Sequence, residues 1–189
     1  MRVLGISGSL RTGSLNSALL RAAAERLPAG AELVQFERLR EVPPYDEDVE
    51  LAAIPAVVEE MRQAVREADA VLIATPEYNH SIPGQLKNAL DWVSRPAGKS
   101  ALNGKPAAAI GASTGMFGAV WAQAELRKVL GALGGRVVET DLPVGHVKDQ
   151  LVGDGLELSP QQSEQLEEIL AELIAEAEIE REAQLAVAA

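Results

Sequence analysis

The first loop that could do chemistry spans residues 8–17, between a short apolar run and a helical pattern. Gly8 and Gly13 let its backbone turn tightly and approach a ligand without contacts to a Cβ atom. Arg11 offers a guanidinium that can bind an anion through two hydrogen bonds. The helix that follows presents backbone N–H groups without intrahelical partners, and the loop adds the hydroxyl side chains Ser9, Thr12, Ser14 and Ser17. Together these groups predict a site for one phosphate group.

The residue types in this loop also decide between classes of phosphate ligand. Residues 8–14 nearly match the loop that binds nucleoside triphosphates, but Ser14 stands where that loop has lysine, and no apolar run ends in an Asp suited to hold Mg²⁺. The spacing of Gly5, Gly8 and Gly13 differs from the G-x-G-x-x-G pattern of dinucleotide sites. The terminal phosphate of a mononucleotide such as FMN fits better. The plain alternative is a strand-to-helix turn in which Ser14 caps the helix.

A second and a third polar loop follow later apolar runs. In residues 75–84 (TPEYNHSIPG), Tyr78 is well placed to contact a ring, whereas Asn79 is also a typical turn residue. We interpret His80 as a wall of the pocket and not as a proton donor. Ser113, within residues 111–115 (GASTG), follows the next apolar run. The three polar loops therefore follow strands whose carboxyl ends are expected to meet at one crevice.

The elements that must position these loops alternate along the chain. Strands are predicted over residues 2–7, 31–36, 70–74, 106–112 and 136–140, and helices over 14–27, 54–68, 83–93, 118–133 and from about 160 onward. Residues 38–50, with an acidic run, and 141–158 are expected to be loops, and residues after about 178 either extend the last helix or fray. Alternation of this kind is typical of a parallel sheet with right-handed crossovers.

We therefore expect one α/β domain over residues 1–189, with a flavodoxin-like, doubly wound five-stranded parallel sheet of order 2-1-3-4-5 and helices on both faces. In this topology the chain reverses direction between the first and third strands. Ligands bind in the crevice at the carboxyl ends of those strands. The first two polar loops both begin there.

The amino-acid composition limits the kinds of partner and cofactor that the chain can bind. The formal net charge of -11 argues against nucleic acid, which needs clustered Lys and Arg. The chain has 0 Cys, so thiol redox chemistry is excluded and any electron chemistry must come from a bound cofactor. The first apolar run is too short for a signal peptide, and no stretch approaches the length of a membrane span. We expect a cytoplasmic protein that binds no membrane and no metal.

Residues 8–16 (GSLRTGSLN) and 76–92 (PEYNHSIPGQLKNALDW) resemble the NAD(P)H-dependent FMN reductases, a family that includes bacterial quinone, chromate and azo-dye reductases. The resemblance implies bound FMN, NADPH or NADH as co-substrate, two-electron reduction of a small acceptor such as a quinone, chromate, an azo dye or free flavin, and a homodimer or homotetramer. The chemistry would be carried by the flavin, with no catalytic side chain. The residues it implies around FMN are Ser9, Leu10, Arg11, Thr12, Gly13, Ser14, Leu15, Asn16, Ser17, Pro76, Glu77, Tyr78, Asn79, His80 and Ser113.

Several alternatives stay open beside this interpretation. A flavodoxin-type carrier would transfer single electrons without oxidising a pyridine nucleotide, and a flavin-binding sensor would bind FMN without turnover. Ser113 with Asp141 and His146 also matches the order of a serine hydrolase, although Asp141 and His146 are too close in sequence for that fold. FMN is either held tightly or exchanged as a substrate. The basic residues on the loops are Arg11, Lys87, Arg95 and Lys99, and none is assigned to a 2′-phosphate.

A further hypothesis concerns Tyr45. It follows the stiff pair Pro43 and Pro44 after the second predicted strand, so it could lie over the mouth of the site in this chain or in a neighbouring subunit. A solvated loop is the alternative.

Overall fold

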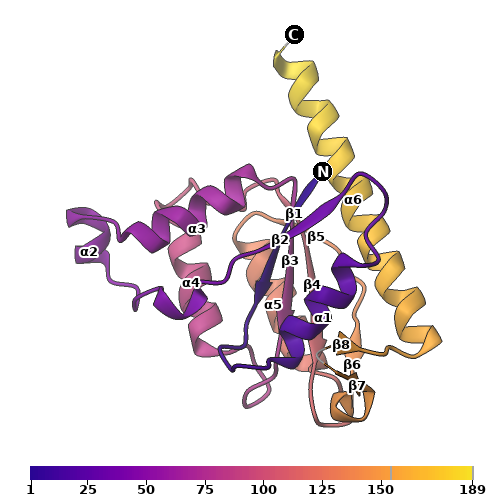
Figure 1. The fold of residues 1–189 in the computed structure, drawn as a ribbon. Coiled ribbons are helices and arrows are strands. Elements are labelled where there is room, and N and C mark those ends of the chain that lie inside the picture. Colours follow the sequence, from indigo (N-terminus) through magenta and orange to yellow (C-terminus); the bar gives the residue numbers. More distant parts are fainter. Residues whose placement is uncertain (154, 189) are drawn as a thin grey trace.

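A computed structural model describes residues 1–153 and 155–188 of the chain. Its centre is a parallel sheet of order β2-β1-β3-β4-β5, with the helices on both of its faces (Figure 1). The strands are β1 (Arg2–Ser7), β2 (Glu32–Gln35), β3 (Ala70–Thr75), β4 (Pro106–Ala112), β5 (Arg136–Val137) and β6 (Pro143–Val144). The predicted fold class and strand order are confirmed.

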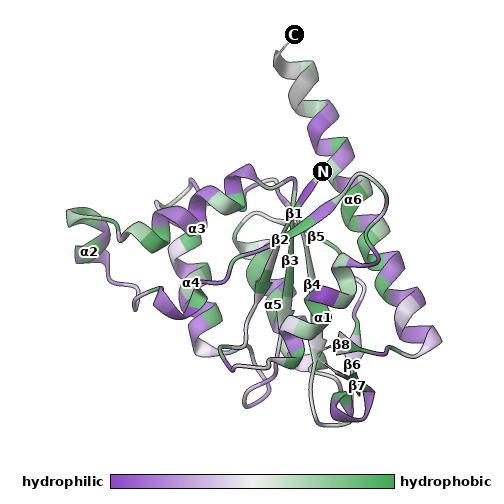
Figure 2. Cartoon of the chain, in the orientation of Figure 1, coloured by the Kyte–Doolittle hydropathy of each residue, from purple (hydrophilic) through white to green (hydrophobic). Residues whose placement is uncertain are grey.

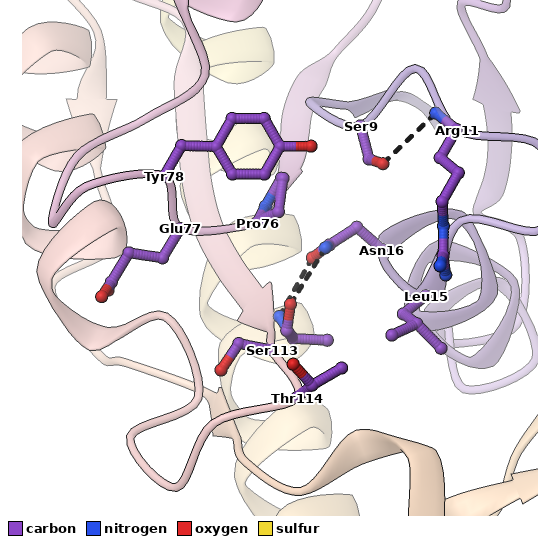
Figure 3. A pocket seen from close by; sticks show the side chains of 10 residues that line it. Ser9, Arg11, Leu15, Asn16, Pro76, Glu77, Tyr78, Ser113 and Thr114 are labelled. Atoms are coloured by element: carbon purple, nitrogen blue, oxygen red, sulfur yellow. Dashed lines mark hydrogen bonds between the residues drawn. The ribbon is translucent and has the colours of Figure 1, made fainter.

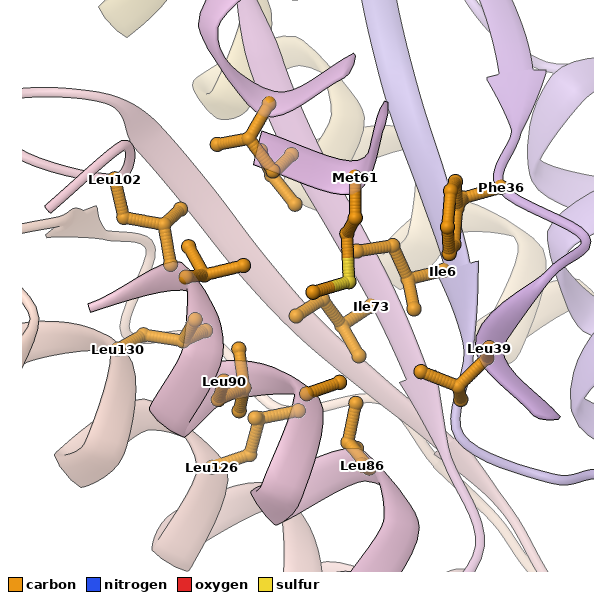
Figure 4. Packing of buried hydrophobic residues seen from close by; sticks show 14 of the residues in the cluster. Ile6, Phe36, Leu39, Met61, Ile73, Leu86, Leu90, Leu102, Leu126 and Leu130 are labelled. Atoms are coloured by element: carbon orange, nitrogen blue, oxygen red, sulfur yellow. The ribbon is translucent and has the colours of Figure 1, made fainter. Parts of the chain in front are cut away.

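Two hydrophobic cores separate the helices into two layers. Apolar side chains on successive residues of a strand point to opposite faces, so Val71 and Ile73 join one core and Leu72 and Ala74 join the other. The first core packs against α3 (Ala56–Glu67), α4 (Gly84–Val93) and α5 (Val120–Ala132), as Figure 4 shows for Met61, Leu86 and Leu126. The second packs against α1 (Leu15–Ala24) and α6 (Pro160–Ala188).

The hydropathy of the elements follows this layering. In Figure 2 the central strands are hydrophobic along their length, whereas the helices carry hydrophobic and hydrophilic residues side by side. This is the pattern of parallel strands covered on both faces and of helices covered on one. Among the described residues, none of the helices combines the length and the apolar character that crossing a lipid bilayer requires.

The fifth strand differs from its prediction. Instead of one strand over residues 136–140, the short strands β5 and β6 both pair with β4, at Pro106–Ala107 and at Gly111–Ala112. Between them the buried side chain of Gln123 takes the place of a strand partner. Its Oε1 accepts a hydrogen bond from Leu142 N (2.9 Å), and its Nε2 donates to Leu142 O (3.1 Å). The predicted strand is therefore shortened to β5, β6 lies within the stretch 141–158 predicted as a loop, and the sheet has six strands instead of five.

Both long loops predicted from the sequence contain short elements. The acidic run forms α2 (Glu47–Ala52), where Asp46 caps the helix by accepting a hydrogen bond from Asp48 N (2.8 Å). Negative charge is favourable in the first turn of a helix, so the same residues that suggest a solvated loop support a helix. The other short elements are the 3₁₀ turns η1 (Leu39–Glu41) and η2 (Val147–Gln150) and the antiparallel pair β7 (Leu151–Val152) and β8 (Gly155–Leu156).

Candidate functional site

Three loops meet at the carboxyl ends of β1, β3 and β4. The strands are in register there, because Ser7 pairs with Ala74 and Thr75 pairs with Gly111. The three loops consequently start at nearly the same level of the sheet. Between them lies a cavity of about 220 Å³, shown in Figure 3 and lined by Ser9, Arg11, Leu15, Asn16, Pro76, Glu77, Tyr78, Ala112, Ser113 and Thr114. We call it the flavin cavity, after the ligand that the sequence predicts.

The first loop is held at both ends. Gly8 N donates to Ala74 O (2.8 Å), which ties the start of the loop to β3. Ser14 caps α1, since its Oγ accepts a hydrogen bond from Ser17 N (3.2 Å). Gly13 has a φ of 68°, a left-handed conformation that glycine adopts without strain. The loop therefore presents the first turn of α1 to the cavity with the unpaired N–H groups of Leu15 and Asn16.

Arg11 lies at the edge of the flavin cavity. Its exposed guanidinium donates to Gly13 O (3.1 Å), so it lies over the turn that precedes α1 (Figure 3). A guanidinium above the positive end of a helix dipole adds to the field that attracts an anion. This arrangement suits the phosphate group predicted from the sequence.

Asn16, which the resemblance implies near FMN, lines the cavity and also connects two of the loops. Its side chain is only 2% exposed, and both amide atoms bond to the backbone at the end of β4. Nδ2 donates to Ala112 O and Oδ1 accepts from Ala112 N, both at 3.0 Å (Figure 3). Asn16 lines the cavity, and one donor and one acceptor of its amide join the first loop to the third.

The second loop reverses direction just after Tyr78. Tyr78 N donates to Ser81 O (2.9 Å) and Ser81 N donates to Tyr78 O (3.1 Å), while Asn79 and His80 have φ values of 52° and 61°. Two consecutive left-handed residues are typical of a tight hairpin turn, which Asn tolerates well. Asn79 and His80 form this turn and do not line the flavin cavity. The Tyr78 ring is 53% exposed and borders the cavity.

Glu77 links the second loop to the helix after the third. Its Oε2 accepts hydrogen bonds from Trp121 N (3.2 Å) and Ala122 N (3.3 Å), at the start of α5. A carboxylate is favoured at this end of a helix dipole. His80 Nδ1 lies 3.6 Å from the other carboxylate oxygen, and the His80 ring packs edge-on against Trp121. Glu77 therefore holds the cavity wall in place as well as lining it.

The third loop carries Ser113, whose Oγ donates to Gly115 O (3.2 Å). In the hydrolase alternative this hydroxyl would donate to His146 and Asp141 would orient that ring. Instead, the Asp141 carboxylate pairs with Arg127. Among the described residues the contacts of a Ser–His–Asp triad are not formed, and Ser113 remains a polar residue at the rim of the flavin cavity.

The residues predicted to surround FMN fall into three groups. Those that line the flavin cavity are Ser9, Arg11, Leu15, Asn16, Pro76, Glu77, Tyr78 and Ser113. Those that line a neighbouring cavity, on the β2 side of the first loop, are Leu10, Thr12 and Ser17, together with Ser9 and Arg11. Those that shape the loops and line neither of these two cavities are Gly13, Ser14, Asn79 and His80. The prediction omitted Ala112 and Thr114, which flank Ser113 at the end of β4.

Tyr45 lies outside the flavin cavity. Its ring packs edge-on against Trp92 (centroids 5.0 Å apart), under the guanidinium of Arg95, and its hydroxyl donates to Glu50 Oε2 (2.9 Å). Removal of the phenol from water and this hydrogen bond both raise the pKa of Tyr45. Within this chain, Tyr45 anchors the loop after β2 and does not cover the cavity.

Comparisons with known proteins agree on one family. A family model described as NADPH-dependent FMN reductase matches residues 1–149. An NAD(P)H-dependent FMN reductase of Pseudomonas aeruginosa is 50% identical over 130 residues, which are 69% of either chain. A 2-hydroxy-1,4-benzoquinone reductase of a Burkholderia species is 43% identical over 129 residues, 68% of this chain and 69% of the relative.

A solved structure shares the fold over nearly its whole length. It is that of FerB, a flavoenzyme NAD(P)H:(acceptor) oxidoreductase from Paracoccus denitrificans, with a TM-score of 0.82 and 32% sequence identity. The match covers 95% of this chain and 98% of that one. The two chains therefore share the overall fold.

Proposed function

We propose, on the premise that the chain belongs to the NADPH-dependent FMN reductase family, that it binds FMN in the flavin cavity and transfers two electrons from NAD(P)H to a small acceptor such as a quinone. The observation that carries the proposal is the meeting of three polar loops at one cavity between β1, β3 and β4. The acceptor class follows from the quinone reductases among the relatives.

The groups present around the cavity fit FMN. Arg11, Ser9 and the first-turn N–H groups of α1 offer cationic and neutral donors for a terminal phosphate. The backbone of Pro76–Tyr78 and the hydroxyls of Ser113 and Thr114 offer polar contacts at the other side, where a flavin ring has its own donors and acceptors. FMN has an anionic phosphate at one end and a ring with polar edges at the other, which matches this distribution of donors and polar groups.

Bound FMN supplies the hydride chemistry between a nicotinamide and the acceptor. The chain's own residues bind and orient. Arg11 holds positive charge at the phosphate end, and Asn16 and Glu77 keep the walls of the cavity together through their backbone bonds. The exposed ring of Tyr78 borders the cavity without closing it, which leaves room for a second molecule to approach. The relatives are reductases, which supports an enzyme over a single-electron carrier.

Titration of the purified chain with FMN tests the proposal. Replacing Arg11 with Gln removes the cation at the phosphate end and is expected to raise the Kd for FMN about 10-fold to 100-fold, because a charge-assisted hydrogen bond contributes about 1.5–3 kcal/mol. Quenching of flavin fluorescence measures the Kd, and bleaching of the bound flavin by NADPH measures its reduction.

Arg181→Gln is the matched control, since Arg181 lies beside Met1 and Arg2 at the amino ends of the strands. Its Kd for FMN should equal that of the wild type. The proposal fails if the wild-type chain takes up no flavin, or if the bound flavin is reduced by neither NADPH nor NADH.

We also propose that the chain forms a homodimer or homotetramer, as the family resemblance implies. Met116, Phe117 and Trp121 are exposed large apolar residues near the start of α5, and Phe117 and Trp121 pack edge-on with centroids 4.9 Å apart. Exposed aromatic clusters of this kind are enriched at protein interfaces. A second copy covering this cluster would remove it from water.

Trp121→Glu is expected to shift the assembly toward the monomer, because it would bury a charge at the contact. Light scattering coupled to gel filtration measures the mass. Val152→Glu, at an exposed apolar residue of β7, serves as the control and should leave the mass unchanged. A monomeric wild type, or a Trp121→Glu variant of unchanged mass, would contradict this interface.

A further inference from the structure

Gln85 is the second residue of α4, and it lines neither the flavin cavity nor the neighbouring cavity on the β2 side of the first loop. Its half-buried side chain bonds to the turn that follows β2 instead. Nε2 donates to Leu39 O and to Val42 O, both at 2.8 Å. An amide nitrogen has two donor hydrogens, so Gln85 uses both of them on the backbone of one turn.

The turn that Gln85 holds is packed on the first hydrophobic core. Leu39 and Val42 are each 3% exposed, and Leu39 belongs to the same cluster as Leu86 of α4 (Figure 4). Apolar packing has no preferred direction, whereas hydrogen bonds do, so the two bonds from Gln85 fix how η1 is oriented on the cluster. That orientation also fixes the position of Arg40, which lies between the two bonded residues in η1.

Arg40 connects η1 to the first loop. Its exposed side chain reaches Leu10, where Nη2 donates a hydrogen bond to the backbone oxygen. The two ends of the first loop are held by Gly8 N and by the Ser14 cap. Arg40 holds the loop between those ends, in the turn that carries Arg11. The position of the phosphate-binding turn therefore depends on a contact from η1.

With this contact, each pair of loops around the flavin cavity is linked. Asn16 joins the first loop to the third, and Glu77 joins the second loop to the helix that follows the third. Gln85 and Arg40 together join the first loop to α4, which begins where the second loop ends. All of these links end on backbone atoms, so each of them fixes the course of a loop.

We propose that Gln85 and Arg40 are positioning residues that hold the first loop in the shape that binds the phosphate of FMN. We call this pair the outer brace. The inference rests on the proposed function, because it requires FMN in the flavin cavity with its phosphate near Arg11. Neither residue of the outer brace lines that cavity. Arg40 carries a charge that also attracts an anion, whereas Gln85 is neutral, so Gln85 separates positioning from attraction.

Fluorescence titration of the full chain with FMN and with riboflavin, which lacks the phosphate, tests the outer brace. Gln85→Met keeps the length of the side chain and removes both donors. It is expected to raise the Kd for FMN about 3-fold to 10-fold, the size of effect that follows the loss of a neutral hydrogen bond. The Kd for riboflavin should stay unchanged, because riboflavin makes no use of the phosphate-binding turn. Unfolding by denaturant, measured in parallel, reports the stability of each variant.

Substitutions of Arg40 test the second residue of the outer brace at an exposed position. Arg40→Met should raise the Kd for FMN at least about 10-fold, because it removes a charge as well as the bond to Leu10 O. Arg40→Lys keeps the charge and a donor and should recover part of the affinity. The double variant Gln85→Met/Arg40→Met should bind FMN as Arg40→Met does, since Gln85 acts on the first loop through Arg40. Fold-changes that multiply would show independent effects and contradict the proposal.

Gln63→Met is the matched control. It makes the same chemical change on the exposed surface of α3, where Gln63 donates to Glu67 Oε1 (2.6 Å). This variant should bind FMN and riboflavin as the wild type does.

Two results would overturn the inference. One is a Gln85→Met variant that loses stability and binds both flavins more weakly by the same factor, since this would assign Gln85 to the fold alone. The other is an unchanged Kd for FMN in both Gln85→Met and Arg40→Met. If the wild type binds FMN and reduces it with NADPH or NADH while the variants behave in this way, the proposed function stands without the outer brace. If the wild type takes up neither flavin, both proposals fall.

Discussion

Gly118→Ala is expected to destabilise the chain by about 2–5 kcal/mol and to disorganise the third loop. Gly118 has a φ of 58°, and a Cβ added there would lie 2.3 Å from Pro143 C and 2.5 Å from Val144 N. The left-handed backbone contributes about 1–2 kcal/mol to the loss. Overpacking contributes about 1–3 kcal/mol more, since the atoms that the Cβ meets are backbone and cannot move aside cheaply. Chemical denaturation measures the free energy of unfolding.

Gly131→Ala provides a control of the opposite sign. Gly131 lies in α5, and a Cβ added there meets nothing within 4 Å. Alanine at this helical position should stabilise the chain by about 0.5–1 kcal/mol. A Gly118→Ala variant as stable as the wild type would show that the third loop can shift away from β6, contrary to the tight packing described above.

Asn16→Asp is expected to destabilise the chain by about as much as Gly118→Ala, and the cause is electrostatic. Substitution of the amide nitrogen by oxygen puts a carboxylate oxygen against Ala112 O, at the 3.0 Å that now separates donor and acceptor. The position is 2% exposed, so water cannot compensate the charge. An uncompensated buried charge destabilises a protein by about 3–5 kcal/mol. The Kd for FMN should also rise, because the first and third loops would separate at the cavity.

The pH dependence of the stability of Asn16→Asp distinguishes a buried charge from the simple loss of a hydrogen bond. Burial raises the pKa of the new Asp above its unfolded value of about 3.9, so the folded state binds the proton more tightly. Stability of the variant relative to wild type is therefore highest below that value and is lost as the pH rises through the folded pKa. Asn103→Asp, at an exposed position, should show no such trend. A pH-independent loss in Asn16→Asp would contradict the electrostatic explanation.

Much of the fold could be predicted because its signals are local. The apolar runs of β1 and β4 predict those strands with the observed bounds, since residues buried on both faces of a sheet leave little choice of side chain. The polar loops were also predictable, because Gly13 and Ser14 are residues that tight turns and helix caps require. Their order along the chain then places them at one edge of the sheet.

What could not be predicted depends on partners far apart in the sequence. Asn16 bonds to Ala112, 96 residues away, and nothing in its neighbourhood distinguishes it from a ligand-binding amide. Gln123 holds Leu142, which lies 19 residues later and directly before β6. Arg40 bonds to Leu10 O because η1 folds back on the first loop, 30 residues before it. Such contacts are products of the tertiary structure, and no local pattern encodes them.

The last helix has a practical consequence for attaching the protein to a surface. Toward its end, α6 packs at the amino ends of the strands, where Arg136 pairs with Glu176 and Glu180 and Arg181 lies beside Met1. Figure 1 shows this end of α6 projecting beyond the sheet, on the side away from the loops after β1, β3 and β4. A linker fused behind α6 would tether the molecule to an electrode or a bead with the flavin cavity facing the solution, so that immobilised protein would stay open to its reductant and its oxidant alike.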